Sequence, residues 1–180
     1  KGFADRGRKL VDAASKAERK TKDGQRITLY ANIEFDEEIE YAMGMGAEGV
    51  GLFRTEFIYA KFGAHPTEEQ HYDTYAKAHK FLAGKLLTLR TMDFGADKFA
   101  AEVGLEHEDN PFLGCRSIRL SLREPQLFTT QIRAILRAGL LGPTRLMLPM
   151  ISGIEEFRQA KSLIEGVKHD LTREGIDFRK

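Results

Sequence analysis

The amino-acid sequence predicts an α/β fold made of four strand–helix units. Short apolar runs alternate along the chain with longer segments that carry helix-start signals, and this alternation implies a parallel sheet with right-handed crossovers. The runs are continuously apolar, which predicts strands that are covered on both faces. Four such units make half of an eight-stranded barrel or a small open sheet, and the pattern leaves both architectures open.

The first 24 residues are predicted to precede the α/β domain as a linker. They are polar and mostly charged, and they predict a surface helix over about residues 5–20, which ends at the turn Lys22-Asp23-Gly24. They lack the apolar core of a signal peptide. The α/β domain is therefore expected to occupy residues 25–180.

The first strand–helix unit begins with residues 27–33 (ITLYANI), which are apolar and β-branched and predict a buried strand. Asp36 is expected to cap a helix over residues 37–45, and Gly46 is expected to end that helix. A second strand is predicted over residues 49–53 (GVGLF).

The second helix is predicted from a capping box, in which Thr67 is followed three residues later by Gln70. This helix should extend to about Ala83, and a third strand is predicted over residues 86–89. A long stretch without clear strand pattern follows, at 94–124. Loops of that length are usually functional or disordered, so an active-site flap and a solvated insertion both fit.

The last two predicted helices flank a fourth strand. Pro125 suits the first turn of a helix that ends near Gly142. Residues 145–151 (RLMLPMI) form the fourth apolar run. A capping box from Ser152 to Glu155 then opens a helix to about Glu174.

The composition excludes several classes of function. The chain has 28 basic and 27 acidic residues, a formal net charge of +1, whereas a dedicated nucleic-acid binder needs a surplus of Lys and Arg. A single cysteine, Cys115, allows no internal disulfide and suits a cytoplasmic protein. No apolar run approaches the roughly 20 residues of a membrane span, so no membrane insertion is expected.

Two arginines follow predicted strands directly. Arg54 comes after the second strand and Arg90 after the third, and ligands of parallel α/β folds bind at the carboxyl ends of strands. Two guanidinium groups suit a ligand with phosphate and carboxylate oxygens. The alternative is that each arginine caps a helix or forms an ion pair with Glu56 or Asp93.

Four segments around these arginines resemble the Enzyme I family, the phosphoenolpyruvate–protein phosphotransferases of the bacterial sugar phosphotransferase system. Residues 46–57 (GAEGVGLFRTEF) match the family's first barrel motif almost letter for letter, and residues 90–98 (RTMDFGADK) are similar to its arginine-threonine-leucine-aspartate motif. Residues 110–119 (NPFLGCRSIR) resemble a third motif, with Cys115 where the family carries an aromatic residue. Residues 131–151 resemble a fourth.

The resemblance implies the first half of the TIM (β/α)8 barrel of phosphoenolpyruvate (PEP)-utilising enzymes, with Arg54 and Arg90 as the residues that bind PEP. Glu56, Asp93 and Lys98 are expected to orient these arginines. No catalytic residue and no metal ligand of the family matches a position in this chain. The Mg²⁺ ligands are expected on later strands of the barrel.

The same resemblance implies the reaction and its partners. The family moves the phosphoryl group of PEP to a histidine on a separate domain of its own chain, and then to a histidine phosphocarrier protein, for sugar uptake. It implies a homodimer of the whole protein. Two alternatives remain: a relative of pyruvate phosphate dikinase or PEP synthase, and a regulatory barrel that binds PEP or a partner protein without catalysis.

The 180 residues are expected to be inactive as an isolated catalyst, because a half-barrel holds only part of the site. A half-barrel also exposes two strand edges and apolar surface. If the chain ends at Lys180, we therefore expect it to self-associate or to alter its packing.

Overall fold

The computed structural model describes residues 19–94 and 114–180, and it has four strands in one parallel sheet. The strands are β1 (Ala31–Ile33), β2 (Gly49–Phe53), β3 (Leu86–Arg90) and β4 (Thr144–Met147), and they lie in the order β1-β2-β3-β4. Sequential parallel strands joined by helical crossovers are the arrangement of successive units in a (β/α)8 barrel. The predicted α/β class and the four strand–helix units are confirmed.

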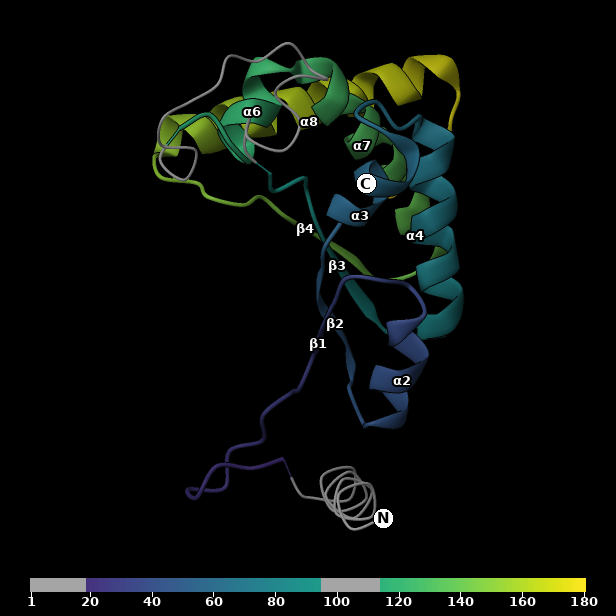
Figure 1. Cartoon of the computed structure of the whole chain (residues 1–180), viewed down its shortest axis with the longest axis vertical. Coiled ribbons are helices and arrows are strands. Elements are labelled where there is room, and N and C mark those ends of the chain that lie inside the picture. The colour runs from purple at the N-terminus through teal and green to yellow at the C-terminus, as the bar shows by residue number, and fades with distance from the viewer. Residues whose placement is uncertain (1–18, 95–113) are drawn as a thin grey trace.

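Helices lie along one side of this sheet and also beyond the carboxyl ends of its strands (Figure 1). The connection after β1 is α2 (Glu38–Gly44), and two helices, α3 (Glu56–Phe62) and α4 (Glu68–Leu82), follow β2. After β3 come α6 (Ile118–Arg123), α7 (Pro125–Ala138) and a 3-10 turn (Gly139–Leu141). The last helix, α8 (Ile154–Glu174), follows β4. None of the helices in residues 19–94 and 114–180 is long and apolar enough to cross a membrane.

Local signals in the sequence fix several helix ends. Thr67 and Gln70 form the predicted capping box at the start of α4, with Thr67 N–H donating to Gln70 Oε1 at 2.8 Å. Pro125 occupies the first turn of α7, as expected. Gly46, at φ +91°, follows the end of α2, and Gly175, at φ +71°, ends α8. Glycine adopts this left-handed conformation without the steric cost of a Cβ atom.

Two of the predicted caps are wrong in detail. Asp36 does not cap α2, because its carboxylate pairs with Lys77 Nζ on α4 at 2.7 Å. The carboxylate of Glu38 instead accepts hydrogen bonds near the start of this helix, from the backbone N–H groups of Glu34 and Phe35. The capping carboxylate at the start of α8 belongs to Glu156 and not to the predicted Glu155. It accepts hydrogen bonds from the N–H groups of Ser152 and Gly153.

Other expectations differ from the structure in extent. The first strand is shorter than the predicted 27–33, because residues 27–30 pair with no neighbouring strand. The sequence pattern did not indicate α3 or α6, and α6 lies within the stretch predicted to be irregular. The turn at 22–24 is present, with Gly24 N–H donating to Thr21 O at 2.9 Å. The predicted helix over 5–20 lies almost entirely outside the described residues, so the linker stays a prediction.

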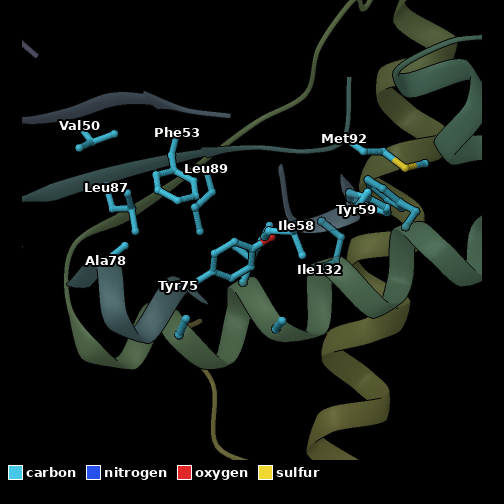
Figure 2. Close-up of a cluster of buried hydrophobic side chains, with 14 of the residues drawn as sticks. Val50, Phe53, Ile58, Tyr59, Tyr75, Ala78, Leu87, Leu89, Met92 and Ile132 are labelled. Carbon is cyan, nitrogen blue, oxygen red and sulfur yellow. The ribbon is translucent and has the colours of Figure 1, made fainter. Parts of the chain in front are cut away.

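The core lies between the sheet and the helices. Phe53, Leu87 and Leu89 are fully buried and point from β2 and β3 toward Tyr75 and Ala78 of α4 (Figure 2). The opposite face of the sheet carries Asn32 and Arg145, which are exposed in the described part of the chain. The expectation of cover on both faces is therefore met on the helical face only, and the open face corresponds to the interior of a closed barrel.

Candidate functional site

The carboxyl ends of β2 and β3 lie side by side. Phe53 of β2 is the register partner of Leu89 of β3, so the residues that follow them, Arg54 and Arg90, are neighbours at the same edge of the sheet. Hydrogen bonds to backbone carbonyl oxygens fix both positions, because Arg54 N–H donates to Ile33 O and Thr55 Oγ1 donates to Arg90 O, each at 2.9 Å. Ligands of parallel sheets bind at this edge.

Two carboxylates hold the guanidinium group of Arg90. Its Nη2 lies 2.9 Å from Glu56 Oε1 and its Nη1 lies 2.8 Å from Asp93 Oδ2. The three side chains are only 16–21% exposed. Glu56 Oε1 also accepts from Asp93 N–H at 2.9 Å, so one carboxylate oxygen joins the guanidinium group to the backbone that follows β3. The arrangement fixes the plane of the guanidinium group.

Burial controls the electrostatics of this cluster. Burial of Glu56 raises the pKa of its carboxyl group above the usual value, and the charge of Arg90 lowers it only in part. Glu56 Oε2 and Arg90 Nε are both buried, and neither has a hydrogen-bond partner within the described residues. Buried polar atoms are usually paired. Among the described residues, the cluster therefore keeps one unsatisfied donor and one unsatisfied acceptor.

The start of α6 closes the cluster on its far side. Ser117 Oγ donates a hydrogen bond to Asp93 Oδ1, and Arg116 Nη2 lies 3.9 Å from the same oxygen. Ser117 has φ +51°, which is rare for a residue with a side chain, and such conformations cluster at functional sites. Arg116 and Ser117 both lie in the predicted irregular stretch 94–124, but no local pattern indicates the contact of Ser117 with Asp93, which spans 24 residues.

Arg54 has a different environment from Arg90. Its side chain is exposed and lines an open pocket of about 220 Å³ together with Asn32, Glu34 and Glu38. The pKa of Glu38 is lowered by hydrogen bonds from the N–H groups of Phe35 and Glu34, and also by the charge of Arg54. The structure thus places the two arginines on adjacent strand ends, with Arg90 locked by carboxylates and Arg54 open to solvent.

Two of the three expected supporting residues reach Arg90. Glu56 and Asp93 contact its guanidinium group directly, whereas Lys98 lies outside the described residues. Ion pairs with Glu56 and Asp93 were the alternative to ligand binding that the sequence left open for Arg90. Contact and ligand binding do not exclude each other, because the guanidinium group has five N–H donors.

Comparison with known proteins gives the family of this chain. The family model described as "PEP-utilising enzyme, PEP-binding domain" matches residues 8–180. The chain belongs to the PEP-utilising enzyme family. The matched range includes Arg54 and Arg90, and also Glu56 and Asp93, which contact Arg90.

Two relatives with similar sequences carry the same name. Proteins named phosphoenolpyruvate-protein phosphotransferase from Staphylococcus carnosus (strain TM300) and Enterococcus faecalis (strain ATCC 700802 / V583) are each 42% identical to the chain, over 161 and 179 residues. These alignments cover 89% and 98% of the chain, but only 28% and 31% of the relatives. The chain therefore spans less than a third of the length of these relatives.

The described residues do not supply a metal site. Within residues 19–94 and 114–180, no group of three or more His, Cys, Asp or Glu side chains is placed to hold a metal ion. Glu56 and Asp93, the carboxylates nearest Arg90, point their bonded oxygens at its guanidinium group. This donor set does not fit the six oxygen ligands that Mg²⁺ prefers.

Proposed function

We propose that the protein that contains this chain is a cytoplasmic phosphoenolpyruvate–protein phosphotransferase, in which this segment binds PEP through Arg54 and Arg90. The phosphoryl group passes to a histidine elsewhere in the same polypeptide and then to a histidine phosphocarrier protein, in support of sugar uptake. The family match and the names of the relatives support the reaction class. The observation that carries the site is the guanidinium group of Arg90, fixed between two carboxylates at the carboxyl end of β3.

The geometry suits a ligand with two anionic groups. Glu56 and Asp93 hold Arg90 through one N–H of each terminal nitrogen, so the second N–H of each can bind phosphate or carboxylate oxygens. Arg54 offers a second guanidinium group at the end of the neighbouring strand, where its side chain is exposed. Arg116, 3.9 Å from Asp93, adds a third positive charge to the same edge. Glu56 and Asp93 face Arg90, and Glu34 and Glu38 line the pocket beside Arg54, so carboxylates accompany the arginines at this edge.

The proposed transfer needs mainly positioning and charge stabilisation. The bond between phosphorus and the enol oxygen of PEP breaks, a bond between phosphorus and the histidine nitrogen forms, and the electron pair stays on the enolate oxygen. Arginines at the strand ends neutralise the charge that moves toward that oxygen. Mg²⁺ is the proposed cofactor, and because the described residues do not fit it, its ligands belong to other parts of the protein.

The experiment measures PEP affinity in the full-length protein with Mg²⁺ present. We expect Arg90→Ala to weaken binding by about 100-fold, since two lost charge-assisted hydrogen bonds are each worth at least about 1.5 kcal/mol. Arg54→Ala should weaken it less, by about tenfold, because this side chain is exposed and screened. The control is Arg158→Ala, which removes an exposed arginine of α8 that pairs with Glu155 one turn away.

A second measurement separates the rival functions. Transfer of the phosphoryl group from labelled PEP to the purified phosphocarrier protein supports the proposal. Formation of ATP from PEP, AMP and pyrophosphate would instead indicate a dikinase, and its formation from PEP, AMP and inorganic phosphate would indicate a synthase. PEP binding without any transfer would indicate a regulatory protein. Unchanged PEP affinity in Arg90→Ala would contradict the proposed binding site.

A further inference from the structure

Gln131 of α7 is fully buried and contacts the chain on both sides of the candidate site. Its Oε1 accepts from the backbone N–H of Met92 at 3.1 Å. Its Nε2 donates to Thr55 Oγ1 at 3.0 Å and to Tyr75 OH at 3.2 Å. One amide group therefore joins the end of β2, the end of β3 and helix α4.

The direction of each hydrogen bond follows from the chemistry of the groups. Because the Met92 N–H can only donate, the side-chain oxygen of Gln131 must face it, and the two N–H bonds of Nε2 then go to the two hydroxyl groups. Thr55 keeps its own proton to donate to Arg90 O at 2.9 Å. Both N–H donors of the amide are used, and replacement by an apolar side chain would leave buried groups unpaired.

The two anchor points lie next to the residues proposed to bind PEP. Thr55 directly follows Arg54, and Met92 directly precedes Asp93, which holds Arg90. The bond from Thr55 to the carbonyl oxygen of Arg90 closes the link between the two strand ends. A shift of Gln131 would thus move both arginines relative to each other.

We infer that Gln131 is a positioning residue, which fixes the separation and orientation of Arg54 and Arg90 so that both guanidinium groups reach one ligand. The inference rests on the proposed function, because it assumes that these arginines bind PEP. A ligand held at two points loses affinity when the points move, even though no atom of Gln131 touches the ligand.

The test measures PEP affinity by calorimetry in the full-length protein with Mg²⁺, well below the melting temperature. Gln131→Met keeps the length of the side chain and removes its hydrogen bonds, and we expect about tenfold weaker binding. The matched control is Gln126→Met, the same substitution at an exposed position in the first turn of the same helix, which should leave the affinity unchanged. A residue that only stabilises the fold would lower the melting temperature and leave the affinity of the folded protein unchanged.

A second pair of variants breaks the same link from its other end. Thr55→Val removes the hydroxyl group and should weaken PEP binding to a similar extent, whereas Thr55→Ser keeps the hydroxyl group and should restore most of the affinity. Thr55 and Gln131 act through one hydrogen bond, so their effects should not add. The PEP affinity of the double variant, Thr55→Val with Gln131→Met, should therefore lie within about twofold of that of either single variant. If Gln131→Met does not fold, the two Thr55 variants decide the question.

Each outcome has a distinct meaning. Tenfold weaker binding in Thr55→Val, and also in Gln131→Met where that variant folds, with rescue by Thr55→Ser, supports the positioning role. Wild-type affinity in folded Gln131→Met or in Thr55→Val overturns it, while a loss of binding in Arg90→Ala still upholds the proposed function. Wild-type affinity in Arg90→Ala overturns the proposed function, and this inference fails with it.

Discussion

His71 of α4 gives the clearest pH-dependent prediction. Its imidazole ring is 1% exposed, and Nδ1 lies 3.0 Å from Tyr75 OH. Burial lowers the pKa of His71 from 6.5 to about 4. Tyr75 OH accepts a hydrogen bond from Gln131, so the hydroxyl proton of Tyr75 can be donated to Nδ1 of His71. If His71 is protonated at Nδ1, this nitrogen can no longer accept that hydrogen bond.

The sign and size of the effect follow from this shift. The unfolded chain binds a proton at His71 below pH 6.5, whereas the folded protein does so only near pH 4, so the stabilisation is complete above 6.5 and is lost as the pH falls through 4. A shift from 6.5 to about 4 corresponds to about 3 kcal/mol, at about 1.4 kcal/mol for each pH unit.

The variant His71→Phe isolates this contribution. At neutral pH we expect it to be less stable than the wild type by about 1 kcal/mol, since Tyr75 OH loses its acceptor. Near pH 4 it should be the more stable of the two by about 2 kcal/mol, because it has no buried imidazole to protonate. The two curves of the free energy of unfolding against pH should therefore cross.

The assay is hydrogen exchange of peptides from β3 in the full-length protein, corrected at each pH for the intrinsic exchange rate. The variant Tyr75→Phe is the comparison, because it removes the hydrogen bond but keeps His71 buried, and it should keep most of the pH dependence of the wild type. Parallel stability curves for the wild type and His71→Phe would refute the reasoning. So would a titration of the His71 ring, observed by NMR, near pH 6.5.

Two further predictions concern stability. Gly49→Ala should destabilise the protein by about 1–3 kcal/mol, because the added Cβ would lie 2.7 Å from the backbone oxygen of Leu86. Gly166→Ala, at an open position within α8, should instead stabilise it by about 0.5–1 kcal/mol. Thermal unfolding of both variants checks the pair, and equal effects would contradict the packing argument. Hydrogen bonds from Ser152, then from Arg119 and Gly153, lower the pKa of Glu156 to about 2, so its stabilising effect should be present above pH 4.5 and lost as the pH falls toward 2. Glu156→Ala should accordingly lower the melting temperature at pH 6 but not at pH 2, and a deficit that persists at pH 2 would count against this cap.

Features that depend on near neighbours in the chain could be predicted from the sequence. The capping box of Thr67 and Gln70, Pro125 in the first turn of α7 and the glycine after α2 each act within a few residues, so their physical effect is visible locally. The four apolar runs gave the strands in the right order, because a buried parallel strand needs a continuous apolar segment. The position of Arg90 at a strand end followed directly from them.

Features that depend on register and on distant segments needed the fold itself. The bonds from Gln131 to Met92 and Thr55 span 39 and 76 residues, and the contact of Ser117 with Asp93 spans 24. Nothing near Gln131 in the chain distinguishes it from an ordinary polar residue of an amphipathic helix. Its role appears only when the sheet brings two strand ends together over α7, because hydrogen bonds are short and directional and require both partners in place.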